Sequence, residues 1–133
     1  METERIQVGM KHTAKETVTN ANTALAMGSG SLPVYATPAM TCLMEKAATE
    51  LAQSCLPEGW TSVGISLDIK HKAATPVGME VQAEAEVTEV DGRKIVYRVR
   101  AFDGKEEIGA GTHERFAVLQ DKFLSKAEGK RQG

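Results

Sequence analysis

The sequence predicts an α+β fold in which one long helix lies against an antiparallel sheet. A single well-marked helical segment covers residues 37–56, and four segments with alternating apolar residues follow it. Another alternating segment precedes the helix, so we expect one strand, the helix and four further strands in that order. The chain has 133 residues, the size of one small domain. We therefore expect residues 1–133 to form a single domain, with frayed tails at residues 1–5 and 124–133.

The region before the helix combines a strand with a loop. Residues 6–19 carry apolar side chains at even positions, namely Ile6, Val8, Met10 and Val18. His12 lies in the same segment, and we assign it a structural role. Residues 20–33 include Gly-Ser-Gly-Ser at positions 28–31, which predicts a flexible loop.

The helix has distinct start and stop signals. Thr37 is placed to cap its first free N–H groups, and Pro38 suits the first helical position. Pro57 and Gly59 end it. Its apolar residues fall on one stripe that we expect to face the sheet: Met40, Leu43, Met44, Ala47, Leu51 and Cys55.

Alternation with a period of two marks the strands that follow. The predicted strands cover residues 63–71, 81–87, 95–101 and 106–119. Turns are expected at residues 74–78 and at the two Asp-Gly pairs, 91–92 and 103–104. In the first of these strands the inward positions are Val63, Ile65, Leu67, Ile69 and, by the same parity, His71.

The composition excludes several classes of function. Sixteen basic and eighteen acidic residues give a net charge of −2, so the chain lacks the basic surface of a nucleic-acid binder or of a protein held on an anionic membrane. No apolar run reaches the ~20 residues that span a bilayer, and the N-terminus lacks a signal-peptide core. Cys42 and Cys55 would lie ~20 Å apart along the helix, too far to pair, and no Cys or His cluster suggests a metal site. We expect a reduced, cytoplasmic protein.

Three residues have side chains suited to nucleophilic or acid–base chemistry. Glu45 lies on a helix flank of small residues, where a ligand or a partner subunit approaches closely; the alternative is an ordinary exposed glutamate. Thr37 is a nucleophile only if a base lies nearby, and is otherwise a helix cap. His71 faces inward at a strand end, either as an acid–base group or as a hydrogen-bonded core residue.

Glycines mark two further places of interest. Gly64 indicates close approach of a ligand to the backbone of its strand. In the last strand, Gly109 and Gly111 leave space beside His113 and Arg115. This face either borders a pocket or belongs to a bulged edge strand with solvated charges.

Three separated segments resemble the hotdog-fold thioesterases, in particular the fluoroacetyl-CoA thioesterase-like family. They are VYATPAMTCLMEKAA at 34–48, IKHKAATPVG at 69–78 and VDGRKIVYRVRAFDGKEEIGAGTHERF at 90–116. The resemblance extends from Gly9 to Phe123, with the elements in the family's order. It implies a hotdog fold, a long central helix wrapped by a curved antiparallel sheet. It also implies a homodimer or a higher homo-oligomer, paired through sheet edges, with acyl-CoA sites at the interface.

The resemblance also implies roles for particular residues. The family's catalytic threonine, glutamate and histidine match Thr37, Glu45 and His71. Its substrate-binding glycine and arginine match Gly64 and Arg115. The implied activity is hydrolysis of the thioester of a short or medium acyl-CoA. Coenzyme A is then part of the substrate, and no metal or redox cofactor is required.

One difference from the family and two alternative functions bear on the activity that the resemblance implies. The family member that hydrolyses fluoroacetyl-CoA has a longer, Phe-bearing lid before its threonine, whereas residues 27–37 here are short, with Leu32 near the expected place of the Phe. Fluorine selectivity is therefore not expected. A non-catalytic module that binds acyl-CoA or another small ligand is the first alternative. A hotdog hydratase is the second, although the sequence lacks the Asp and His pair that such enzymes carry after the helix.

Overall fold

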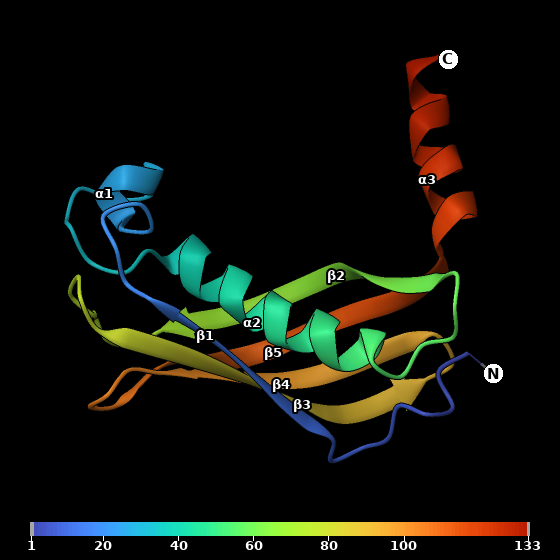
Figure 1. The fold of residues 1–133 in the computed structure, drawn as a ribbon, viewed down its shortest axis with the longest axis horizontal. Helices are drawn as coiled ribbons and strands as arrows, with labels where there is room; N and C mark the ends of the chain where they lie inside the picture. Colours follow the sequence, from blue (N-terminus) through green and yellow to red (C-terminus); the bar gives the residue numbers. More distant parts are fainter. Residues whose placement is uncertain (1, 133) are drawn as a thin grey trace.

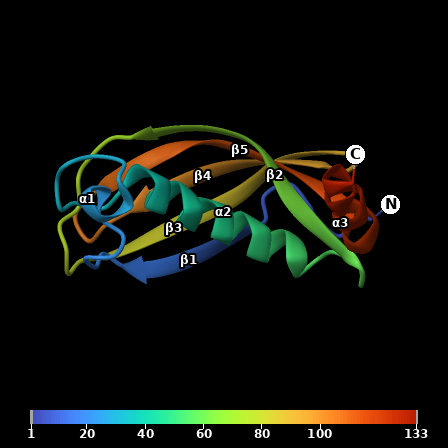
Figure 2. The ribbon, with the colours of Figure 1, turned by 90° about the horizontal axis from the view of Figure 1, so that it is seen from above.

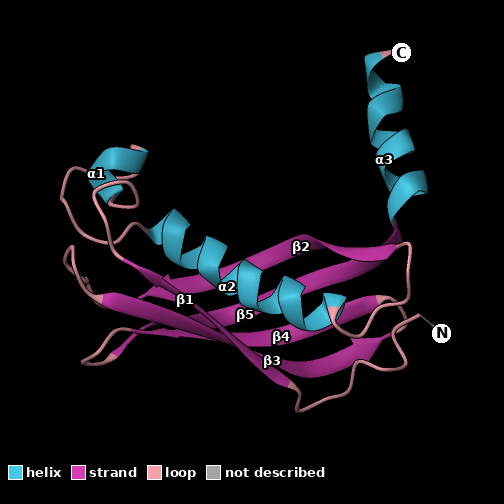
Figure 3. Ribbon diagram, in the orientation of Figure 1, coloured by secondary structure: helices cyan, strands magenta, loops and turns pink. Residues whose placement is uncertain are grey.

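A curved five-stranded antiparallel sheet wraps around one long helix (Figure 1). The computed structural model describes residues 2–132. The elements are β1 (Lys11–Thr17), α1 (Ala24–Met27), α2 (Thr37–Gln53), β2 (Trp60–His71), β3 (Glu80–Asp91), β4 (Lys94–Phe102), β5 (Glu107–Leu119), α3 (Gln120–Glu128) and the 3-10 turn η1 (Gly129–Arg131). The predicted order of one strand, the long helix and four strands is confirmed. Figure 3 distinguishes the helices from the strands by colour.

The strands lie in the order β1-β3-β4-β5-β2, and every neighbouring pair is antiparallel. Both Asp-Gly pairs occur in hairpins, between β3 and β4 and between β4 and β5. α2 packs against β1, β2 and β3 on the concave face of the sheet, which curves around it (Figure 2). Consequently β1 and β2, at the two edges, flank the helix, and β2 runs alongside α2 from Gln53 at its C-terminal end to Thr37 at its N-terminal end.

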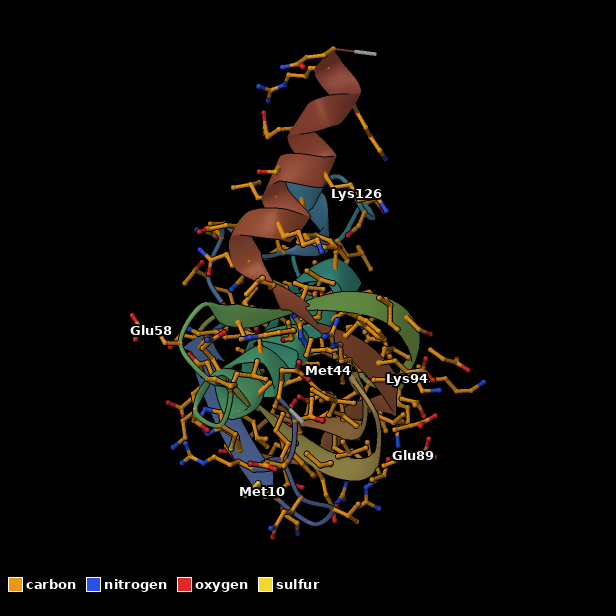
Figure 4. The ribbon with its side chains drawn as sticks, turned by 90° about the vertical axis from the view of Figure 1, so that its right-hand side faces the viewer. Met10, Met44, Glu58, Glu89, Lys94 and Lys126 are labelled. Carbon is orange, nitrogen blue, oxygen red and sulfur yellow. The ribbon has the colours of Figure 1, made fainter. Side chains whose placement is uncertain are left out.

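The core is formed where the apolar stripe of α2 meets the inward residues of the sheet. All six residues of the predicted stripe are buried, because side chains three and four apart share one helix face. Met44 points into the interior between α2 and the sheet, whereas Glu58 and Glu89 lie on the outside (Figure 4). Ala48 and Ala52 are buried as well, so the flank of small residues lets the sheet approach α2 closely.

The strand β2 changes its inward parity at a β-bulge. Its register against β5 shifts around Ile65, which has no partner in the ladder. Before the bulge the even positions face inward, as the buried Ser62 does; after it the odd positions do. The prediction that Val63 and Ile65 line the inward face is therefore wrong. Leu67 has the inward parity but is 44% exposed, whereas Ile69 packs on the core and His71 reaches α2, as predicted. An alternating sequence pattern cannot reveal such a bulge, because the extra residue shifts by one position which side chains face inward.

The connections and ends are more ordered than the sequence predicts. The first strand is confined to residues 11–17, and the region predicted as a flexible loop contains α1. Thr23 caps α1 by accepting a hydrogen bond from the amide of Ala26, and Gly28 ends it in the left-handed conformation.

The expected frayed tails are also structured within the described residues. Thr3 is buried and donates to the carbonyl of Gly92 at 2.5 Å, and residues 120–128 form α3, which stands away from the sheet (Figure 1). α2 ends at Gln53 rather than at residue 56, so Cys55 lies beyond it; Cys42 and Cys55 are both free. No helix within residues 2–132 is long and apolar enough to cross a membrane.

Candidate active site

The side chains of Thr37 and His71 form a hydrogen-bonded pair at the N-terminal end of α2. Thr37 Oγ1 lies 2.8 Å from His71 Nδ1. The prediction that Thr37 caps the helix is wrong: Ala36 is the N-cap residue, and no side chain bonds to the free N–H groups there. Thr37 instead occupies the first turn beside Pro38. Its hydroxyl is therefore available to the histidine.

Backbone contacts between two loops bring this pair together. The amide of Tyr35 donates to the carbonyl of Thr75 at 2.9 Å, and Val34 forms an antiparallel bridge with Pro76. The buried Thr75 hydroxyl donates to Asp103 at 2.7 Å, which ties this crossing to the β4–β5 hairpin. The segment just before Thr37 and the segment just after His71 are thus fixed to each other.

His71 is in a state suited to accepting a proton. Burial lowers the pKa of its imidazole below the ordinary histidine value, and the backbone of Ala73 opposes this only in part. The imidazole is therefore neutral near pH 7. Its Nε2 is buried and is the one buried side-chain nitrogen or oxygen within residues 2–132 that lacks a hydrogen-bond partner. The Thr37 hydroxyl can either donate or accept a hydrogen bond. It is therefore compatible with a neutral His71 that carries its proton on either ring nitrogen.

A cavity of about 310 Å³ adjoins the pair. Its walls come from α1, from the segment that enters α2 and from the end of β2, and most of the side chains are small: Ala24, Ser29, Val34, Tyr35, Thr37, His71, Lys72, Ala73 and Ala74. Leu32 is not among them, and its side chain is 63% exposed. The Thr37 hydroxyl and the His71 imidazole thus lie in a small pocket whose lining is part apolar and part polar, the latter including Ser29 and Lys72.

Glu45 lies farther along α2, beside the bulge of β2. Its Oε2 is 3.6 Å from Nη1 of Arg115, and the carboxylate is 39% exposed. A Cβ atom at position 64 would lie 2.8 Å from the same carboxylate oxygen, so a larger residue there would require the Glu45 side chain to move. Glu45 of the same chain lies close to Gly64, and the approach of a ligand to this backbone stays a prediction.

Arg115 is buried and engages mainly protein groups. Its Nε donates to Ser62 Oγ at 2.8 Å, its Nη2 to the carbonyl of Ser62 at 2.9 Å, and its Nη1 lies 3.2 Å from His113 Nε2. These contacts use three of the five N–H groups of the guanidinium. The resemblance implies that Arg115 binds substrate, and this stays a prediction. Ser62 was missed because the bulge hides its inward position.

The two groups of residues are separate within one chain. Within residues 2–132, no hydrogen bond or ion pair joins Glu45 to Thr37 or His71. Thr37 and Glu45 are eight residues apart, which is ~12 Å along the axis of a helix. The structure therefore brings together Thr37 with His71, and Glu45 with Gly64 and Arg115.

The space expected beside the glycines of β5 is filled by neighbouring atoms. The glycines of β5 do not border a pocket: a Cβ at Gly109 would lie 2.5 Å from the Met40 sulfur, and one at Gly111 would lie 2.0 Å from the carbonyl oxygen of Asp68. Without side chains, these two residues allow close packing at both positions.

His12, which we assigned a structural role, lies 3.0 Å from Glu50 on the exposed side of α2. Across the described chain, no group of three or more His, Cys, Asp or Glu side chains could hold a metal ion.

Comparison with known proteins identifies the chain's relatives. The family described as fluoroacetyl-CoA-specific thioesterase matches residues 18–121. The fluoroacetyl-CoA thioesterase of Streptantibioticus cattleyicolor is 42% identical over 97 residues, which is 73% of this chain and 70% of that protein.

Solved structures give the same result. A structure of the fluoroacetyl-CoA thioesterase FlK superposes with a TM-score of 0.88 at 36% identity, covering 94% of this chain and 97% of that one. A thioesterase superfamily member from Thermus thermophilus gives a TM-score of 0.90 at 26% identity, covering 97% and 96%. The fold and these relatives define a hotdog-fold thioester hydrolase. Within that class, the chain belongs to the fluoroacetyl-CoA-specific thioesterase family.

We expect His71 to titrate below the ordinary histidine pKa, because burial disfavours its charged form. A pH titration of the imidazole resonances of the three histidines by NMR, assigned with His71→Gln, measures this. In Thr37→Val, which removes the hydroxyl and retains the bulk, the pKa should stay below the ordinary value. A midpoint at or above that value in the unaltered protein would contradict burial as the main cause.

Proposed function

We propose that this protein hydrolyses the thioester of a short or medium acyl-CoA, with Thr37, His71 and Glu45 as its catalytic residues. The observation that carries the proposal is the hydrogen bond between Thr37 Oγ1 and His71 Nδ1 at the wall of a cavity. A hydroxyl bonded to a neutral imidazole is the arrangement by which enzymes activate a nucleophile. Membership of a thioesterase family supports the reaction class.

The proposed chemistry begins when Thr37 Oγ, or a water that it positions, attacks the thioester carbonyl carbon. The proton of the attacking hydroxyl passes to Nδ1 of His71, which is neutral because burial lowers its pKa. The C–S bond then breaks, and the departing coenzyme A sulfur takes the proton. If Thr37 is acylated in this step, water hydrolyses the ester in a second step, again with His71 as the base.

Backbone N–H groups at the bulge of β2 in a second copy of the chain are the proposed stabilisers of the oxyanion, because Gly64 and Thr37 lie in separate groups within one chain. The ladder is interrupted next to Gly64, where a glycine leaves the backbone open to close approach. Glu45 lies against this point, with Arg115 behind it. We assign Glu45 the orientation of the attacking group and a part in the proton transfers.

The size and lining of the cavity support a short acyl group without selection for fluorine. About 310 Å³ is at the lower end of the ~300–1,000 Å³ that small-molecule pockets occupy. No phenylalanine lines it, and Leu32, near the expected place of the lid Phe, is mostly exposed. The proposed substrate class is therefore broader than fluoroacetyl-CoA, the substrate named for the relative. We also propose that hydrolysis proceeds without a metal or redox cofactor, in the cytoplasm.

We further propose that the working unit is a homodimer or a higher homo-oligomer paired along β2. β2 is a long edge strand that exposes apolar side chains to solvent: Ile65 is 51% exposed and Leu67 is 44% exposed. The other edge, β1, presents the exposed lysines Lys11 and Lys15, which disfavour edge pairing. A second copy on β2 would also lie next to the separated halves of the site.

The proposed catalytic residues predict large losses of turnover. Thr37→Ala, His71→Gln and Glu45→Gln should each lower kcat by about 10²–10⁴-fold, the usual contribution of a positioned acid–base group. Release of free coenzyme A, followed with a thiol reagent and corrected for Cys42 and Cys55, measures this.

Two matched variants control for changes of charge and shape. Glu50→Gln on the same helix and His12→Gln on β1 each remove one partner of an exposed pair outside the proposed site. Both variants should therefore hydrolyse the substrate with an unchanged kcat. If Glu45→Gln is as active as Glu50→Gln, Glu45 has no catalytic part.

A panel of acyl-CoA substrates tests the substrate class. We expect the highest kcat/KM with two- to six-carbon acyl groups, and values for acetyl-CoA and fluoroacetyl-CoA within about tenfold of each other, since a small pocket separates analogues of nearly equal size weakly. Binding of every acyl-CoA without turnover above background would instead indicate the non-catalytic module. Loss of enoyl-CoA absorbance without thiol release would indicate the hydratase.

The proposed dimer predicts a mass of about twice 14.3 kDa by light scattering at micromolar concentration. Leu67→Lys places a charge at the exposed apolar edge and should shift the mass towards the monomer, with a parallel loss of activity. Val8→Lys adds the same charge at an exposed apolar residue before β1 and should leave the mass unchanged. A fully active monomer would rule out a site that needs a second copy.

A further inference from the structure

The guanidinium of Arg115 is fixed by groups that do not belong to the proposed catalytic set. Ser62 accepts from it twice, through its hydroxyl at 2.8 Å and its carbonyl at 2.9 Å, and His113 accepts from Nη1 at 3.2 Å. The remaining direction of Nη1 is towards Glu45, 3.6 Å away. Because Arg115 is only 7% exposed, its hydrogen bonds depend mainly on these buried protein acceptors. The position of the positive charge behind Glu45 is therefore set by Ser62 and His113.

The partners of His113 determine where its proton lies. Nδ1 is 2.8 Å from the carbonyl oxygen of Ser66, and Nε2 is 3.2 Å from Arg115 Nη1. A carbonyl can only accept and a guanidinium can only donate. His113 must therefore be neutral, with its proton on Nδ1 and a lone pair on Nε2. This bonding state is the only one that satisfies both neighbours.

The surroundings of His113 maintain this neutral form. The side chain is fully buried, and its ring stacks on that of Tyr97 with centroids 6.1 Å apart. Burial lowers the pKa of His113, and the charge of Arg115 acts in the same direction. The carbonyl of Ser66 and the carboxylates of Glu45 and Glu114 oppose this. The Tyr97 hydroxyl is un-ionised, because burial raises its pKa, and it donates to the carbonyl of Ala48.

We propose that His113 and Ser62 are positioning residues for the reaction: together they orient Arg115, and Arg115 orients the Glu45 carboxylate. This inference rests on the proposed function, in which Glu45 takes part in catalysis. Neither His113 nor Ser62 touches the reacting groups. Their effect on turnover passes through Glu45 and disappears when Glu45 no longer acts.

A double-mutant cycle tests this route. In the otherwise unaltered protein, His113→Leu should lower kcat about tenfold or more and leave KM within about threefold, because the lost interaction acts on the transition state. His113→Gln retains an amide oxygen as an acceptor for Arg115 and should recover kcat to within about threefold of normal. In the Glu45→Gln background, His113→Leu should change kcat by less than about twofold. Equal losses in both backgrounds, or a glutamine as harmful as leucine, would overturn the inference.

Further measurements separate positioning from folding. Tyr97→Phe removes the bond to Ala48 next to the same network, so it should lower Tm without changing kcat. If His113→Leu does not fold, Ser62→Ala replaces it in the cycle, because it removes one acceptor of Arg115 and leaves His113 in place.

Nitrogen NMR of the imidazole gives a readout independent of activity. We expect Nδ1 of His113 to be protonated and Nε2 unprotonated near pH 7, and a proton on Nε2 would by itself overturn the inference. If Glu45→Gln is fully active, the proposed role of Glu45 fails, and this spectrum still tests the network around Arg115.

Discussion

The packing of α2 along the concave sheet is the constraint on which the site depends. The apolar stripe around Met44 fixes the rotation of the helix, and the buried Ala48 and Ala52 fix its distance from the strands. With both set, Thr37 at the N-terminal end meets the end of β2, and Glu45 two turns later meets its bulge. A helix turned by one residue, about 100°, would carry Glu45 away from Arg115 and direct a buried side chain into solvent. The geometry of the polar groups thus follows from the packing of apolar ones.

The two inward histidines differ because their partners differ. The partner of His71 is a hydroxyl, which can give or take a proton, so the imidazole can change its protonation state during a reaction. The partners of His113 are a carbonyl and a guanidinium, which permit a single state. Burial lowers the pKa of both, and a low pKa alone therefore does not distinguish a base from a positioning group. The hydrogen-bonding capacity of the neighbours makes that distinction.

Much of the fold could be predicted from the sequence, because the buried face of α2 and the alternation in β3, β4 and β5 are local patterns. The site was predictable in part. The prediction that odd positions of this strand face inward is correct for His71, which lies after the bulge of β2. It is wrong before the bulge, so it did not identify the inward Ser62. Thr37 suited a helix cap on local grounds, and only the crossing with the loop after β2 shows that its hydroxyl faces a histidine. The role of Arg115 was not predictable, because Ser62 and Glu45 are distant in sequence, and the two-residue spacing of His113 does not by itself show a hydrogen bond to the guanidinium.

The bulge at Ile65 gives β2 an unusual sensitivity to length. A substitution at an outward position changes one point of the surface, but the loss or gain of one residue between Ser62 and His71 exchanges the two faces of half the strand. Either Ser62 then turns away from Arg115, or His71 turns away from Thr37. During evolutionary divergence this strand can therefore accept many replacements of its outward side chains, whereas an insertion or deletion within it separates the two halves of the site. Its residue count is more constrained than its composition.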